Sequence, residues 1–186
     1  MIAFEKQGLA AMNLDTKADY GTISKTLHWV VAITIISLLA AGFIMINLDK
    51  SPLKWQIYGI HKAMGITILA IAVIRIVWRI THVKPPLPVN YPKWQRIASA
   101  AVHGLLYLIT IIMPLSGWIM SMAADHIPSW FGLFELRLPI AASKPLAKIA
   151  SNCHEIIAWI LIACLILHIG AAIKDKRVLS RMLVKK

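Results

Sequence analysis

The sequence predicts an all-α membrane protein, a four-transmembrane-helix up-down bundle with both termini in the cytoplasm. Hydrophobic residues make up 59% of the 186 residues, a larger share than soluble globular domains contain. They gather in four runs, each long enough to cross a bilayer as a helix of about 20 residues. Short polar or proline-containing segments separate the runs, so neighbouring helices are expected to run antiparallel.

The predicted spans cover residues 27–48, 57–78, 100–122 and 152–173. With their connections they form one predicted membrane domain over residues 23–175. Residues 1–22 are predicted to be a cytoplasmic N-terminal tail, and residues 176–186 a basic cytoplasmic tail. Inside the third span, Met113-Pro114 predicts a kink, which membrane-spanning helices tolerate.

The basic residues predict the orientation of the chain, whose net charge is +12. With the N-terminus inside, fourteen of the 20 lysines and arginines fall on the cytoplasmic side of the spans and six on the other side. An excess of positive charge marks the cytoplasmic side, so both termini are expected there. Because these residues flank apolar runs, the charge indicates contact with the lipid bilayer and not with nucleic acid.

The fourth span carries a histidine near each end, His154 and His168. At 100° per residue the two share one face of the helix and lie roughly 21 Å apart along its axis. Ionisable residues inside a span are costly and mark functional sites. The predicted orientation puts His61 at the outer level with His154, and puts His28 and His103 at the inner level with His168.

The outer level therefore has two histidines, the number of axial ligands that the iron of haem b accepts. The inner level has three, one more than such an iron needs. Two haem groups, one at each level, could be enclosed by the four helices. Arg75 and Arg79 lie at the inner end on the face of His61, where they could bind anionic haem propionates, although ordinary anchoring at the cytoplasmic surface explains them as well. Gly65, one turn after His61, leaves space for a ring edge.

The motifs that contain these residues occur in the order and with the spacings of a known family. They are Leu27-His28-Trp29, Ile60-His61-Lys62-Ala63-Met64-Gly65, Ile74-Arg75-Ile76-Val77-Trp78-Arg79, His103 with Met113-Pro114-Leu115-Ser116-Gly117, and His154-Glu155 with Leu167-His168. Over about residues 20–183 the sequence resembles the bacterial cytochrome b561 family. The resemblance implies a cytochrome of the bacterial inner membrane with two haem b groups (iron protoporphyrin IX) that exchanges electrons with ubiquinone. A member of this family oxidises superoxide at the outer face.

Carried over residue by residue, the resemblance makes His61 and His154 the iron ligands of the outer haem, and His28 and His168 those of the inner haem. His103 matches a family histidine that is expected near the inner haem or the quinone pocket. The sequence departs from the family at one place. After Leu167-His168 the family usually has a further His-His pair, whereas this chain reads Gly170-Ala171-Ala172, so the residues of a quinone site stay open.

Three functions follow as hypotheses. The first is a di-haem cytochrome that passes electrons from a periplasmic-side donor such as superoxide to ubiquinone; as an enzyme it would be a superoxide:ubiquinone oxidoreductase. The second is a haem b anchor subunit that passes electrons from a separate dehydrogenase to quinone. The third is a haem-free, histidine-based proton or metal transporter, although inverted repeats typical of transporters are missing. Basic residues on the outer side favour an anionic donor, while acidic residues on that side oppose it: Asp125, Glu135 and Glu155.

Overall fold

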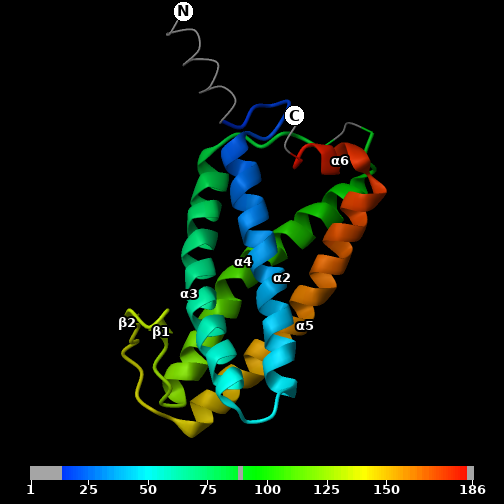
Figure 1. Cartoon of the computed structure of the whole chain (residues 1–186). Helices are drawn as coiled ribbons and strands as arrows, with labels where there is room; N and C mark the ends of the chain where they lie inside the picture. Colours follow the sequence, from blue (N-terminus) through cyan, green and yellow to red (C-terminus); the bar gives the residue numbers. More distant parts are fainter. Residues whose placement is uncertain (1–13, 88–89, 184–186) are drawn as a thin grey trace, which may run out of the picture.

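The computed structural model describes residues 14–87 and 90–183, and four long helices dominate it (Figure 1). All four are long and apolar enough to cross a membrane, so the predicted fold class, an all-α four-helix membrane bundle, is confirmed. The helices are α2 (Thr22–Asn47), α3 (Pro52–Thr81), α4 (Lys93–Ala123) and α5 (Lys144–Lys174). Each has between 26 and 31 residues, more than the roughly 20 that a bilayer needs, so their ends extend past the predicted spans.

The starts of α3 and α5 follow from a serine followed by proline. The Ser51 hydroxyl accepts a hydrogen bond from the backbone N–H of Lys54, and Ser143 does the same for Leu146. A serine N-cap satisfies one of the free N–H groups at a helix start, and proline in the first turn has no N–H to satisfy. At the end of α2, the Lys54 ammonium donates to the Leu48 carbonyl at 2.6 Å. The turn between α2 and α3 is therefore tight and fixed.

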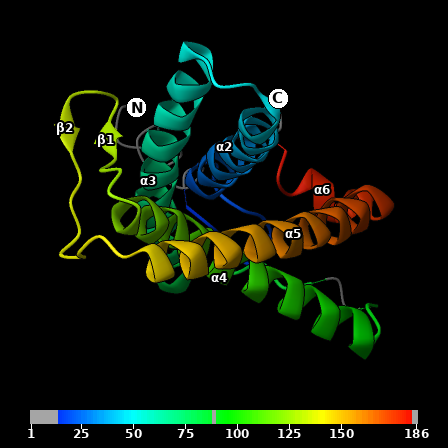
Figure 2. The ribbon, with the colours of Figure 1, turned by 90° about the horizontal axis from the view of Figure 1, so that it is seen from below.

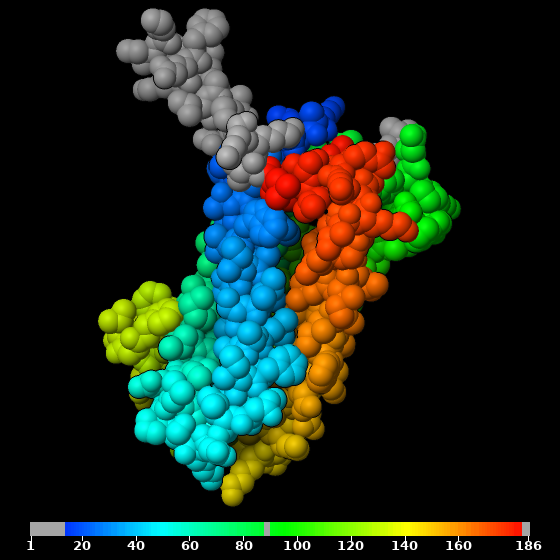
Figure 3. Space-filling view, turned by 45° about the vertical axis from the view of Figure 1, so that its right-hand side comes forward, coloured from blue at the N-terminus to red at the C-terminus, as the bar shows by residue number. Residues whose placement is uncertain are grey.

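Helices that follow each other in the chain pack side by side: α2 against α3, α3 against α4, and α4 against α5. Figure 2 shows the resulting arrangement along the bundle axis, with α3 and α5 on opposite sides. Of the four long helices, α2 and α5 face each other across a furrow that is open in the space-filling view (Figure 3). Phe43 and Trp159 bridge this furrow, with ring centres 5.8 Å apart.

The apolar core of the bundle is small and lies near the middle of its length. Its fully buried members are Ile109 of α4 with Leu161 and Cys164 of α5, and Leu39 of α2 packs against them. Leu161 is seven residues from His154 and seven from His168. The core therefore separates the two levels at which the sequence places its histidines.

A short hairpin lies beside α3, in the half of the bundle away from the termini (Figure 1). Its strands are β1 (Ser129–Trp130) and β2 (Phe134–Glu135), which pair antiparallel. The turn between them contains Phe131 at φ 49° and Gly132 at φ 79°. The Trp130 indole N–H donates to the Thr67 hydroxyl at 3.0 Å, and this bond holds the hairpin against α3.

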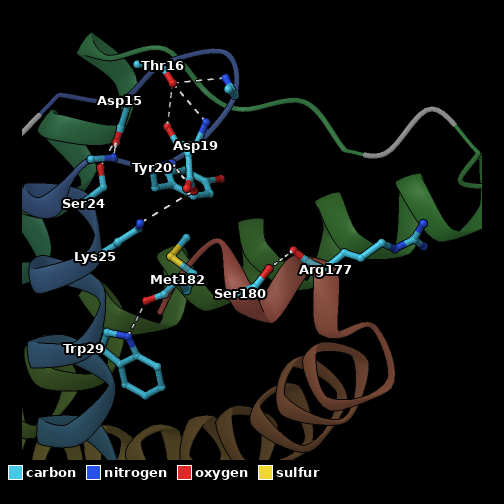
Figure 4. Close-up of polar contacts among 12 residues, drawn as sticks. Asp15, Thr16, Asp19, Tyr20, Ser24, Lys25, Trp29, Arg177, Ser180 and Met182 are labelled. Carbon is cyan, nitrogen blue, oxygen red and sulfur yellow. Dashed lines mark hydrogen bonds and ion pairs between the residues drawn. The ribbon is translucent and has the colours of Figure 1, made fainter. Parts of the chain in front are cut away.

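The C-terminal segment folds across the other end, where α6 (Lys176–Ser180) follows α5. The Trp29 indole N–H donates to the Met182 carbonyl at 2.9 Å, so this segment is joined to α2 (Figure 4). Of the predicted N-terminal tail, residues 1–13 lie outside the described residues. Residues 14–21 form a hydrogen-bonded loop, in which the Gly21 N–H donates to the Asp15 carboxylate at 2.7 Å. Of the predicted C-terminal tail, residues 184–186 also lie outside the described part.

Candidate functional site

The structure brings together the two histidines predicted for the outer level. His61 of α3 and His154 of α5 face each other across the bundle with ring centres 6.4 Å apart and ring planes at 72°. A metal–imidazole bond is about 2 Å long, so two imidazoles on opposite sides of one metal have ring centres about 6 Å apart. The spacing therefore fits a pair of axial ligands.

Two cavities adjoin this pair of histidines. One, of about 1070 Å³, lies between α3, α4 and the hairpin; the other, of about 400 Å³, lies among all four helices. His61, His154 and Gly65 line both. A side-chain Cβ added at Gly65 would meet no atom within 4 Å, so Gly65 borders open space, as its proposed role beside a flat ligand requires.

The hydrogen bonds of the two outer histidines differ. The Nδ1 atom of His154 lies 3.1 Å from the Met113 carbonyl oxygen and 3.0 Å from the Ser116 hydroxyl. A carbonyl can only accept, so Nδ1 of His154 carries the proton and Nε2 keeps the lone pair that binds a metal. The Nδ1 atom of His61 is buried and has no hydrogen-bond partner among the described residues, and a buried polar atom left in this way indicates a missing partner on that ring.

Three histidines meet at the inner level, as the sequence predicts. The ring of His168 on α5 lies 6.1 Å from that of His28 on α2 and 5.1 Å from that of His103 on α4. His28 and His168 have the spacing that suits two ligands on one metal, whereas His103 is about 1 Å too close to His168. The Nδ1 atom of His103 bonds to the Ser99 carbonyl at 2.6 Å, which leaves its Nε2 atom free of the proton.

Arg75 lies inside the bundle at the same level. Its Nη2 atom donates to Nδ1 of His28 at 2.8 Å, and its guanidinium lies 5.4 Å from the centre of the Tyr107 ring. An imidazole and a phenol ring carry no negative charge. Among the described residues, no carboxylate forms an ion pair with the Arg75 guanidinium. A guanidinium removed from water in this way needs an anion or several good acceptors. Arg75 is therefore a candidate for binding an acidic group of a ligand.

Arg79 lies closer to the end of the bundle than Arg75. Burial raises the pKa of the Tyr20 phenol, and the positive charge of Arg79 opposes that rise. Burial lowers the pKa of Lys84, and the positive charge of Arg79 lowers it further. The two arginines that the sequence groups together thus have different surroundings: Arg75 contacts His28 and Tyr107, whereas Arg79 lies near Tyr20 and Lys84.

The remaining two histidines are not paired with these sets, although His126 lines the larger cavity beside the outer pair. His82 follows the last turn of α3 and stacks on Trp78, with ring centres 3.6 Å apart. His126 lies in the loop after α4, where its backbone N–H donates to the Ser121 carbonyl. Within residues 14–87 and 90–183, no group of three or more His, Cys, Asp or Glu residues could hold a bare metal ion. Facing pairs of imidazoles suit an iron whose other four ligands come from a macrocycle.

Sequence reasoning missed the partners of His154. Met113-Pro114 was interpreted only as a kink, and Ser116 and Gly117 had no assigned role. In the structure, this part of α4 contacts the imidazole of His154. The proline and the glycine mark an irregular part of the helix, but the contact joins residues about forty positions apart, and no local pattern reports it.

Comparison with known proteins gives the family of the chain. A profile of prokaryotic cytochrome b561 matches residues 19–185. The chain is also 32% identical over 184 residues to the cytochrome b561 homolog 2 of Escherichia coli (strain K12), an alignment that covers 92% of this chain and 94% of that protein. With four spanning helices and histidines that face each other in pairs, the protein therefore belongs to the prokaryotic cytochrome b561 family, whose members are multi-pass inner-membrane proteins that bind haem b and transfer electrons.

Proposed function

We propose that the protein holds two haem b groups, one at each histidine level, and that it conducts electrons from a donor on the periplasmic side to ubiquinone. The observation that carries the proposal is the pairing of imidazoles across the bundle, at 6.4 Å for His61 with His154 and 6.1 Å for His28 with His168. Bound at these pairs, the haem irons would supply two one-electron carriers.

At the outer level, His61 and His154 are the proposed ligands. Both imidazoles line both of the adjoining cavities, which suits a flat ring held between them. Gly65 lines both cavities, and its lack of a side chain keeps this space open. The unpartnered Nδ1 of His61 and the carbonyl-bonded Nδ1 of His154 give this level two imidazoles that can each present Nε2.

At the inner level, His28 and His168 are the proposed ligands, and the ring spacing supports this pair over His103 and His168. The hydrogen bonds point the other way. Arg75 donates to Nδ1 of His28, so a neutral His28 carries its proton on Nε2. For His28 to bind iron through Nε2, Arg75 must leave Nδ1, and its guanidinium is then available for a haem propionate. Arg79, nearer to the surface, is the proposed second contact of the propionates.

The chain keeps its two proposed sites apart. His154 and His168 are about 21 Å apart along α5 by the rise of the helix. Ile109, Leu161 and Cys164 fill the space between these levels and are at most 5% exposed. Packed side chains of this kind exclude water from the space that they fill.

The proposed orientation puts both termini in the cytoplasm, which makes the level of His61 and His154 the periplasmic one. The larger cavity beside it is lined by Lys62 but also by Asp125 and Glu135. These mixed charges give a weak attraction for an anion, so superoxide is the proposed donor on the ground of family resemblance more than of charge. Without a second histidine pair after His168, ubiquinone would be bound by other residues at the inner level.

The experiment that tests the proposal is a reduced-minus-oxidised visible spectrum of the detergent-purified protein, with haem counted per chain. Two low-spin b-type haems per chain are expected, falling to one in each of His61→Ala, His154→Ala, His28→Ala and His168→Ala. His82→Ala, which changes a histidine that lines neither cavity and stacks on Trp78, is the matched control and should keep both. A native protein without haem would overturn the proposal. If His28→Ala keeps two haems while His103→Ala loses one, then His103 is the inner ligand.

A further inference from the structure

The part of α4 around Pro114 makes a specific contact with the imidazole of His154. The Met113 carbonyl precedes Pro114 and accepts from Nδ1 of His154 at 3.1 Å. The Ser116 hydroxyl donates to the same carbonyl at 2.7 Å, and its oxygen lies 3.0 Å from the same Nδ1 atom. Ser116 is only 9% exposed. Nδ1–H is therefore shared between two acceptors that also bind each other, and this fixes the ring in one tautomer.

Gly117 brings the backbone of α4 against the same ring. A Cβ atom at this position would lie 3.0 Å from Cε1 and 3.2 Å from Nδ1 of His154, closer than carbon atoms ordinarily approach. The ring of His154 thus rests on the glycine and can turn little about its bond to Cβ. His61 is held less closely: a Cβ at Gly42 would lie 3.7 Å from its Cε1 atom, an ordinary contact, and its Nδ1 atom has no acceptor.

We propose that Ser116 and Gly117 are positioning residues for His154, and that they make it the more strongly electron-donating of the two axial ligands at the outer level. This inference rests on the proposed function, in which His154 binds the outer iron. An acceptor on Nδ1–H increases the basicity of the opposite nitrogen of a ligating imidazole. A more basic ligand stabilises oxidised iron over reduced iron, so the contact with α4 lowers the reduction potential of the outer haem.

Ser116→Ala is the first test, with a redox titration of both haems as the measurement. It removes one of the two acceptors and leaves the carbonyl, so both haems are retained. The reduction potential of the outer haem should rise by the equivalent of a threefold to tenfold change in its redox equilibrium, where tenfold corresponds to 59 mV for one electron. The haem that His154→Ala removes is the one whose potential must move. Ser37→Ala, at an exposed serine of α2, is the matched control and should change neither potential.

Gly117→Ala is the second test, and it probes the geometry of the ring. The added methyl group must push the imidazole aside, so the outer haem should be lost or lose its low-spin spectrum while the inner haem remains. The retained inner haem shows that the bundle has folded. Gly104→Ala, on the same helix with no atom within 4 Å of its added Cβ, is the control and should keep both haems.

The outcomes separate this inference from the proposed function. If Ser116→Ala leaves both potentials unchanged, or if Gly117→Ala keeps both haems with native potentials, the positioning role is overturned while the haem sites stand. If His154→Ala itself keeps both haems, the ligand assignment fails, and this result does not depend on either α4 variant.

Discussion

Histidines of the same chemical type receive different hydrogen bonds in this bundle. Nδ1 of His154 meets a carbonyl and a hydroxyl on α4, Nδ1 of His103 meets a carbonyl of its own helix, and Nδ1 of His28 meets the guanidinium of Arg75. A carbonyl acceptor prepares the far nitrogen for metal binding, whereas a guanidinium donor does the opposite. The surroundings of each ring therefore decide its role more than its position along the helix does.

Arg75 gives a prediction at this scale. If its guanidinium binds a propionate of the inner haem, Arg75→Gln should weaken the binding of that haem by about 10- to 150-fold, since hydrogen bonds to charged groups contribute about 1.5–3 kcal/mol. Arg75→Lys should weaken it less, because lysine keeps the charge but not the two-pronged geometry. Titration of haemin into haem-depleted protein measures the affinity of each site.

The control for this prediction is Arg137→Gln, which removes an exposed arginine whose partner is Glu135 near the hairpin. It should leave both affinities unchanged. Equal haem affinity in the native protein and in Arg75→Gln would show that Arg75 serves only to anchor the cytoplasmic end of the bundle.

Single residues also show what the sequence could and could not predict about the site. The helical repeat places His154 and His168 on one face. The orientation of the spans puts His61 at the depth of His154 and His28 at the depth of His168. The two clusters of histidines in the structure therefore follow from local rules. Contacts such as that of Ser116 with His154 depend on how α4 and α5 are rotated against each other. That rotation comes from packing over the whole bundle, and one sequence does not reveal it.

Among the elements, the C-terminal segment does more than end the chain. The Tyr91 hydroxyl donates to the Asp175 carboxylate, and Arg177 donates to the same carboxylate at 2.9 and 3.0 Å. Arg181 donates to the Pro86 carbonyl at 2.7 Å. The segment is thereby joined to the connection between α3 and α4 and, through Trp29, to α2. It covers the end of the bundle beside the inner histidines.

Asp175→Asn gives a prediction for this element. The substitution removes the negative charge of the carboxylate that accepts hydrogen bonds from Tyr91 and Arg177 and that caps the start of α6. Residues 176–183 should therefore exchange their amide hydrogens several-fold faster, while the spanning helices stay protected. Hydrogen–deuterium exchange measured by mass spectrometry tests this. Asp49→Asn, at an exposed position at the opposite end, should leave the exchange of this segment unchanged; the same exchange in Asp175→Asn and the native protein would contradict the role of this carboxylate.

The pH dependence of the same segment follows from its pKa. The hydrogen bonds from Arg177 and Tyr91 hold the pKa of Asp175 well below its usual range. A pKa lowered by folding means that the carboxylate stabilises the segment fully above the ordinary aspartate pKa of about 3.9, and that this stabilisation is lost only as the pH falls through the lowered value. Protection of residues 176–183, corrected for the intrinsic exchange rate, should therefore be constant between about pH 5 and 8.

The elements also differ in how far the sequence predicts them. All four long helices follow from apolar runs, and the starts of α3 and α5 also have a serine followed by proline. The sequence does not predict the hairpin of β1 and β2, because two-residue strands have no detectable alternation. It depends on left-handed backbone at Phe131 and Gly132 and on the bond from Trp130 to Thr67 of α3, a contact between distant parts of the chain.

At the scale of the whole molecule, the bundle has a small plug of buried residues instead of a continuous core. The plug lies between the cavities beside the outer histidines and the polar side chains at the inner level. Ile109, Leu161 and Cys164 form that plug, while the outer half of the bundle holds about 1070 and 400 Å³ of open space. Filling such space with apolar ring surface adds burial that the protein lacks by itself. Any ligand that binds only the folded bundle also stabilises it by mass action, so haem binding and the packing of α2 against α5 are expected to depend on each other.

The charge distribution gives the last prediction, which concerns the orientation of the whole bundle. Both described ends of the chain lie at one end of the molecule, with the turn between α2 and α3 at the other (Figure 1). Of the 17 lysines and arginines among the described residues, eleven lie in segments at the first end and six in segments at the other. The first end should therefore face the cytoplasm. In a background with Cys153→Ser and Cys164→Ser, a membrane-impermeant thiol reagent should label Lys50→Cys in cells whose outer membrane alone is permeabilised. It should label Lys176→Cys, which is also exposed, only after the inner membrane is opened. The reverse pattern would place the level of His61 and His154 on the cytoplasmic side and exclude a periplasmic donor there.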